Sequence, residues 1–205
     1  LWGLGEGLLH TGRAEEAIAA SAEALSIARA LHEDRPERAS RLILQASLER
    51  HAAMLGIVGE IEEAERNLRE ELEISEWGLA HGDAIVPESV GSHVHSLLSL
   101  GEFLARRSDL EEAEKLLVRA YELQMSLADL SEPRSDDVRR VMAIRLLLAE
   151  VVSQRGEYDL AVDWASPIIP AARELFDAEP RKEYRVALCT VLERVSTIAW
   201  SAGDS

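Results

Sequence analysis

The sequence predicts an all-α protein in which one helix–turn–helix unit repeats along the chain. A short phrase that runs from a small residue to an alanine recurs four times, at Gly12–Ala17, Gly59–Ala64, Ser108–Ala113 and Gly156–Ala161. Its copies are 47, 49 and 48 residues apart. Prolines recur in step with the phrase, at Pro36, Pro87, Pro133 and Pro180. Aromatic residues make up only 4% of the 205 residues, and no segment alternates apolar and polar side chains as a β-strand does.

The recurring phrase predicts a tight turn followed by a helix. Its first residue, a glycine in three copies and again at Gly203, can adopt the left-handed conformation that ends a helix. The acidic residues that follow, such as Glu62 and Glu63, fall in the first turn of the next helix, where carboxylates complement the positive end of the helix dipole. Within that helix the apolar residues recur about every 3.6 positions, as they do over 110–123.

Prolines open each new unit, because proline fits the first turn of a helix and disrupts a helix interior. Two helices of about 20 residues cannot bury both their faces alone, so neighbouring units must stack to complete the core. The repeats expected from this pattern cover 1–35, 36–86, 87–132 and 133–179, with a partial fifth over 180–205.

One segment of the fourth repeat, Ser166–Pro170, carries two prolines inside its second helix. It predicts either a kink that reshapes or exposes the surface, or a helix that stops and restarts at Pro167. Trp164, just before this segment, is expected in the core. So is Cys189, the single cysteine, as a buried and reduced thiol, because it falls in an apolar helical pattern.

These features resemble tetratricopeptide repeats (TPRs). In that family the first helix carries Leu-Gly and a bulky residue three positions on, and an alanine of the second helix packs against it. The closest matches are Leu4, Gly5, Leu8 and Ala17 in the first copy and Leu100, Gly101, Leu104 and Ala113 in the third. The second and fourth copies match more loosely, through Ala52, Leu55, Ala64 and Leu68, and through Leu148, Ala149, Val152 and Ala161.

A period near 48 residues is longer than is usual for the family and is similar to the long-helix repeats of kinesin light chains, as is the loop over 31–39. The resemblance covers nearly the whole chain and implies a right-handed α–α superhelical solenoid of about four repeats. Both ends of the sequence fall within a repeat, so we expect a segment of a larger protein. We expect this parent to be a bacterial, cytoplasmic protein, and the resemblance implies that it joins the repeats to other domains.

Charge limits the class of partner. The chain carries 22 Lys and Arg against 38 Asp and Glu, a formal net charge of −16. Such a surface repels nucleic acid and anionic lipid and attracts a basic protein segment. No apolar stretch approaches the roughly 18 residues that cross a bilayer, so we expect no membrane partner.

In TPR arrays the first helices of successive repeats line a concave groove that binds a partner polypeptide. Among the residues that the resemblance places in that groove, the candidates for peptide binding are Trp2, Glu6, Glu49, Leu98, Glu102, Arg106, Leu146, Glu150, Glu193 and Trp200. One glutamate per repeat would form an acidic track for a basic peptide, with apolar residues as anchors. The alternative is that these glutamates pair with neighbouring arginines and only keep the groove soluble.

We therefore expect a protein-interaction scaffold, and no enzyme, cofactor or metal site. The six histidines are scattered, and His95, Ser99 and Glu102 share a helix face without matching a known catalytic motif. Two other functions remain open. The first is a regulatory sensor array, which binds a short peptide or small ligand and passes a change of curvature to an effector domain. The second is a helical-repeat enzyme with its active site in the cavity.

Overall fold

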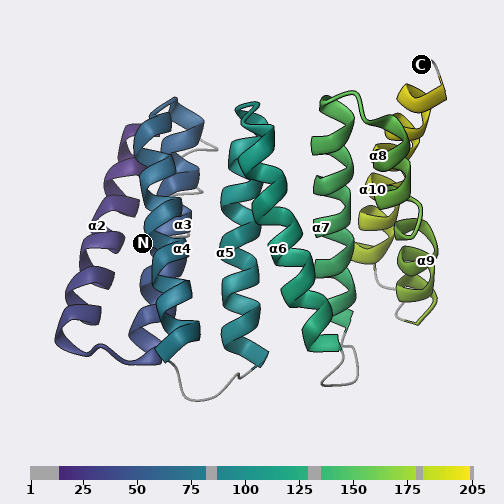
Figure 1. Cartoon of the computed structure of the whole chain (residues 1–205). Helices are drawn as coiled ribbons and strands as arrows, with labels where there is room; N and C mark the ends of the chain where they lie inside the picture. The colour runs from purple at the N-terminus through teal and green to yellow at the C-terminus, as the bar shows by residue number, and fades with distance from the viewer. Residues whose placement is uncertain (1–13, 82–86, 129–134, 179–181, 204–205) are drawn as a thin grey trace. The chain divides into compact units, whose positions relative to one another are not determined.

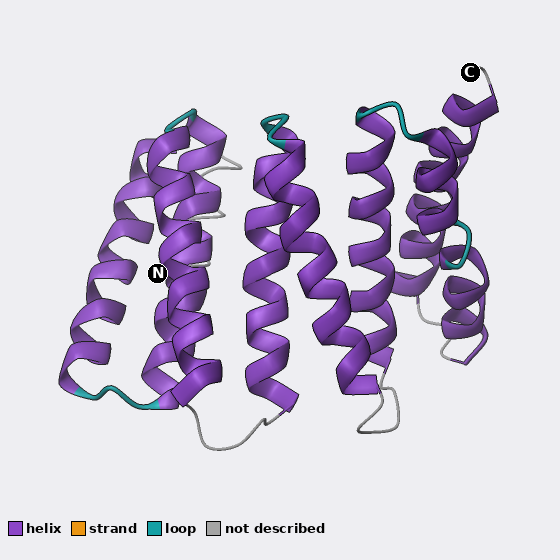
Figure 2. Cartoon of the chain, in the orientation of Figure 1, coloured by secondary structure: helices purple, strands orange, loops and turns teal. Residues whose placement is uncertain are grey.

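Every regular element of the computed structural model is an α-helix within the residues it describes, which are 14–81, 87–128, 135–178 and 182–203 (Figures 1 and 2). In chain order these helices are α2 (Ala14–Asp34), α3 (Arg38–Val58), α4 (Ile61–His81), α5 (Pro87–Arg106), α6 (Leu110–Ala128), α7 (Ser135–Gln154), α8 (Tyr158–Ala165), α9 (Ile168–Ala178) and α10 (Lys182–Gly203). The predicted all-α class is confirmed for this part of the chain.

The chain forms two compact units, residues 1–100 and 101–205, and the boundary between them lies within α5. In the first unit α3 packs against both α2 and α4, and Figure 1 shows these three helices at the purple and blue end of the chain. In the second unit α7 packs against α6, α8, α9 and α10.

The three described turns of the recurring phrase share one geometry. The small residue is left-handed in each, with φ of +88° at Gly59, +65° at Ser108 and +82° at Gly156. The amide of the next residue then bonds a carbonyl five positions back, in the pairs Glu60–Leu55, Asp109–Leu104 and Glu157–Val152, at 3.0 Å each. This bond is the signature of a Schellman helix end, so the predicted turn is confirmed here. Gly203 differs, because it is the last residue of α10 and does not adopt a left-handed φ.

The turn at Ser108 makes a stability prediction. A serine in the left-handed region meets a steric cost that glycine avoids, and the other copies have glycine at this position. Ser108 is exposed, so its side chain contributes little burial. We expect Ser108→Gly to raise the free energy of unfolding by about 0.5–1 kcal/mol, measured by urea denaturation. A lower stability of the variant would show that the serine hydroxyl contributes more than the backbone strain costs.

The alanine that ends the phrase is fully buried in every copy, at Ala17, Ala64, Ala113 and Ala161. A small side chain at this position lets the second helix of a repeat come close to the first. The approach is tight at Gly101 of α5, where an added Cβ would lie 3.0 Å from Leu117 Cδ2 of α6. The predicted packing of the alanine is therefore confirmed.

In the fourth repeat the second helix is divided in two. α8 ends at Ala165 and α9 begins at Ile168. Of the two predicted alternatives, the structure therefore shows a helix that stops and restarts around Pro167. Pro170 then lies in the first turn of α9, where a backbone N–H has no partner within the helix and proline costs little. Trp164 is half-buried and packs against the core of this unit, as predicted.

Cys189 corrects an expectation, because its side chain is exposed and not buried. The reason lies in the face that α10 turns toward the core. Val191, Val195 and Ile198 pack there, at spacings of four and three residues. Cys189 is two residues from Val191, so a helix of 3.6 residues per turn directs it to another side.

Candidate functional site

The predicted groove residue of the second repeat, Glu49, lies on an exposed face of α3. Leu42, Glu49, Ala53 and Ile57 are spaced by seven, four and four residues and therefore share one side of this helix. Leu42 and Ala53 are exposed, and Ile57 is exposed to 65%. We call these four residues the α3 face. It combines aliphatic side chains in contact with solvent and a single carboxylate.

Glu49 connects the α3 face to α5. His95 Nε2 lies 2.9 Å from Glu49 Oε1, and the Ser99 hydroxyl donates a 3.4 Å bond to the same oxygen. The hydrogen bond with His95 is the main reason why the pKa of Glu49 lies below its ordinary value. Both bonds end on the carboxylate, so the serine hydroxyl donates to Glu49. The arrangement is a polar contact between two helices.

A buried carboxyl lies in the same unit, on α4. Glu71 is only 2% exposed, and its Oε1 accepts a 2.8 Å hydrogen bond from the Ser96 hydroxyl of α5. Its Oε2 is also buried and has no hydrogen-bond partner among the described residues. Burial raises the pKa of Glu71 from 4.5 to about 7, although the bond from Ser96 favours the ionised form.

Sequence reasoning missed Glu71, although a signal for it exists. Ala64, Leu68, Glu71 and Ser75 recur at spacings of four, three and four residues, so Glu71 falls on the buried stripe of α4. All four of these side chains are buried. The sequence signal for such a buried carboxyl is a glutamate on the apolar stripe of a helix whose other acidic residues are at least partly exposed.

Three predicted groove residues lie on α5. Leu98 is half-buried in the first unit. Glu102 and Arg106 belong to the second unit and form an exposed ion pair at 2.5 Å, one helical turn apart. Such an exposed pair contributes little to stability.

The second unit has a small cleft between α7 and α10. It encloses about 250 Å³ and is lined by Glu150, Ser153, Gln154, Arg194, Thr197 and Ile198. Arg194 donates two hydrogen bonds to the carboxylate of Glu150, each 2.5 Å long, through Nε and Nη2. Glu193 is exposed on the same helix as Arg194, and Trp200 is exposed to 73%.

Leu146 does not fit the groove prediction, because it is buried. It packs with Met142 and Ala149 of α7 against Val195 and Ile198 of α10. α10 lies against α7 and covers this side chain, so Leu146 belongs to the core. Trp2 and Glu6 lie outside the described residues. Of the glutamates predicted for the acidic track, four lie within the described residues, Glu49, Glu102, Glu150 and Glu193, and the first three contact a histidine or an arginine.

Within the described residues no group of three or more His, Cys, Asp or Glu side chains is placed to hold a metal ion. The described helices also include none that is long and apolar enough to cross a membrane.

The surfaces described above offer exposed aliphatic and aromatic side chains beside paired charges. These are the groups that a protein partner contacts.

The architecture is that of TPR-like repeats, as the sequence resemblance implied. A crystal structure of BtubC (BKLC) from P. vanneervenii matches with a TM-score of 0.65 and 17% identity, over 92% of this chain and 72% of that one. The nearly identical TPR-like repeats of a kinesin-light-chain-like protein from Podosopora anserina match with a TM-score of 0.61 and 19% identity, over 100% of this chain and 95% of theirs. No protein-family model and no curated protein matches the sequence. The similarity to the long-helix, kinesin-light-chain type of repeat is confirmed at the level of the fold.

Proposed function

We propose that this chain is a protein-interaction module, and not an enzyme, which binds a partner polypeptide along the exposed faces of its first helices. The observation that carries the proposal is the α3 face, because Leu42 and Ile57 place aliphatic side chains in water on either side of Glu49. A soluble helix gains nothing from exposing a row of this kind, whereas a partner that covers it gains the burial. Trp200 offers a comparable anchor in the second unit.

The binding energy should come mainly from these apolar anchors. Covering an aliphatic side chain contributes about 1.5–3 kcal/mol, whereas an exposed ion pair contributes about 0–1 kcal/mol. Glu49, Glu102 and Glu150 each have a partner within the chain, so a cation of the ligand must replace that partner. The carboxylates therefore contribute more to the specificity of binding than to its affinity.

The net charge favours a partner with basic segments. At −16 the chain attracts a cationic polypeptide over many ångströms and repels an acidic one. The ligand we expect is an extended or helical peptide that alternates leucine with arginine or lysine.

The test is a pair of fluorescent peptides that differ only in charge, one alternating Leu with Arg and the other Leu with Glu. Fluorescence anisotropy at physiological salt should show binding of the arginine peptide alone. Ile57→Ser should weaken that binding by about tenfold, because it removes one anchor. Ile27→Ser is the matched control, since Ile27 of α2 is exposed to 56% but lies outside the α3 face. Equal binding of both peptides, or an equal loss in the two variants, would contradict the proposal.

A further inference from the structure

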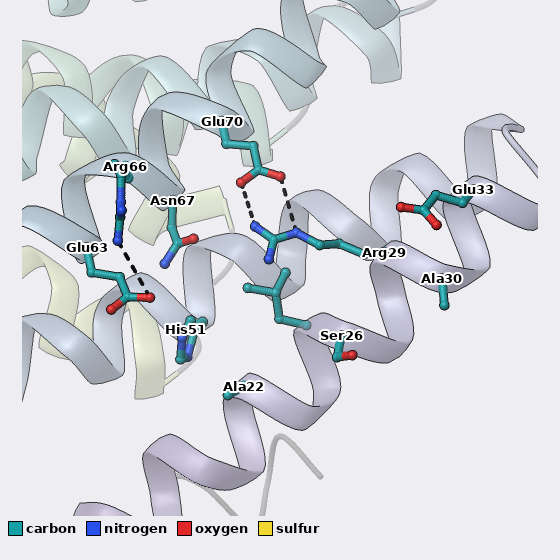
Figure 3. A pocket seen from close by; sticks show the side chains of 11 residues that line it. Ala22, Ser26, Arg29, Ala30, Glu33, His51, Glu63, Arg66, Asn67 and Glu70 are labelled. Atoms are coloured by element: carbon teal, nitrogen blue, oxygen red, sulfur yellow. Dashed lines mark hydrogen bonds and ion pairs between the residues drawn. The ribbon is translucent and has the colours of Figure 1, made fainter.

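A large polar cleft lies between α2 and α4 in the first unit, with α3 as its floor (Figure 3). It encloses about 660 Å³, within the range of roughly 300–1,000 Å³ that is typical of small-molecule sites. Small side chains of α2 line one wall, at Ala22, Ser26 and Ala30. The proposed polypeptide surface on the α3 face uses none of the residues that line this cleft.

Two residues at the floor of the cleft depart from the repeat pattern. His51 of α3 stands 13 residues before the buried alanine of its repeat, and the third and fourth repeats have Leu100 and Leu148 at that position, both fully buried. Asn67 stands three residues after the same alanine, where those repeats have Leu116 and Trp164. Both His51 and Asn67 are only 6% exposed. The second repeat therefore buries two polar side chains where the others place apolar ones.

A serine fixes the role of His51. Ser21 Oγ lies 2.8 Å from His51 Nδ1 and donates its own hydrogen to the Ile18 carbonyl, at 2.9 Å. A hydroxyl has one hydrogen, so with that hydrogen on the Ile18 carbonyl it is Nδ1–H of His51 that donates to Ser21. Burial lowers the pKa of His51, so the ring is neutral. The remaining nitrogen, Nε2, then carries a lone pair and is an acceptor.

Asn67 supplies the complementary donor. Its Nδ2 is buried and has no hydrogen-bond partner among the described residues. A ligand acceptor that reached this N–H would supply the missing hydrogen bond. In Figure 3 the Asn67 carboxamide lies between two ion pairs at the walls of the cleft.

The walls carry two arginines, each paired with a glutamate, and a third glutamate, Glu33 of α2. Arg29 of α2 binds Glu70 of α4, with Nη2 2.6 Å from Oε2, and Arg66 lies 3.8 Å from Glu63 on α4. Each guanidinium thus already faces a carboxylate, so the cleft has no spare cation for a phosphate or a carboxylate ligand. The paired side chains still have hydrogen-bonding atoms to offer, as both arginines and both glutamates are partly or largely exposed.

We propose that this cleft binds a neutral, hydroxyl-rich small molecule, a sugar or polyol. Hydroxyls of such a ligand can accept from Asn67 Nδ2 and donate to His51 Nε2, so a polyol can satisfy both floor residues. Further hydroxyls bond the arginine and glutamate side chains of the walls. The proposal does not depend on polypeptide binding and would survive its failure.

The test is nuclear magnetic resonance titration of the 205-residue chain, labelled with ¹⁵N, with D-glucose, D-mannose and myo-inositol as neutral probes. L-lysine and succinate serve as charged probes. We expect one neutral probe to shift the Asn67 side-chain amide signals saturably, with a Kd on the order of 1 mM. The side-chain amide of Gln124, which is buried in the other unit, is the internal control and should not move.

Asn67→Leu and His51→Leu install the kind of residue that the other repeats carry. Each should abolish saturable binding of the neutral probe, followed by backbone amide shifts around the cleft. Each should also raise the Tm, by about 2–4 °C, because an unsatisfied or costly polar group is removed from the core. The proposal fails if no neutral probe binds, if only a charged probe binds, if binding persists in either variant, or if either variant lowers the Tm.

Discussion

Replacing Glu71 with glutamine should raise the free energy of unfolding at pH 8 by about 3 kcal/mol. The pKa of this carboxyl is about 7 in the folded chain, against an ordinary value of 4.5. A carboxyl whose pKa is raised by folding stabilises the folded state fully below the unfolded value. That stability is lost as the pH rises from 4.5 toward 7, because ionisation then places a charge in the core. Glutamine resembles the protonated acid and cannot ionise, so the variant avoids the loss.

The pH dependence separates this explanation from a general effect of the substitution. Urea denaturation should show a gain of about 3 kcal/mol for Glu71→Gln at pH 8 and of less than about 1 kcal/mol at pH 5, where the folded glutamate is protonated and the unfolded one is still mostly ionised. Glu73→Gln is the matched control, because Glu73 lies on the same helix and is exposed. A gain of equal size at both pH values would mean that the ionisation of Glu71 is not its cause. A lower free energy of unfolding for Glu71→Gln at pH 8 would mean that the hydrogen bond from Ser96 to the carboxylate stabilises the fold more than the buried charge destabilises it.

Local rules in the sequence were enough to predict the repeated skeleton. A glycine or serine before acidic residues predicts a turn, and Gly59, Ser108 and Gly156 adopt it. The buried alanines follow from the 3.6-residue period of the helices, since each falls on the apolar stripe. These features depend only on residues within about one helical turn of each other, and such residues can be identified from the sequence alone.

The burial of polar groups could not be predicted in the same way. Whether Leu146 faces solvent depends on α10, whose residues lie about 50 positions further along the chain. Glu71 and His51 are single polar residues on otherwise ordinary helices, and their hydrogen-bond partners Ser96 and Ser21 belong to neighbouring helices. Their significance appears only when the helices are packed and each position is compared with its counterparts in the other repeats.

That comparison gives a second large prediction, in which a histidine is placed at the position of His51 in another repeat. Leu148 of α7 is fully buried and occupies this position in the fourth repeat. The residue that corresponds to Ser21 is Leu117, which is also fully buried, so an imidazole at 148 would have no serine to accept from Nδ1–H. We expect Leu148→His to lower the free energy of unfolding by about 3–5 kcal/mol, from lost burial and an unsatisfied polar group.

Urea denaturation of four chains tests the reason as well as the size of this effect: the native sequence, Leu148→His, Leu117→Ser and the double variant. The serine should recover about 1 kcal/mol as a favourable coupling between the two substitutions, because it recreates the bond that Ser21 makes to His51. His51→Leu should act in the opposite direction and stabilise the chain. If Leu148→His costs less than about 1 kcal/mol, this position tolerates imidazole in any repeat. The buried His51 would then need no ligand to account for it, and the argument for a sugar or polyol in the α2–α4 cleft would lose one of its two floor residues.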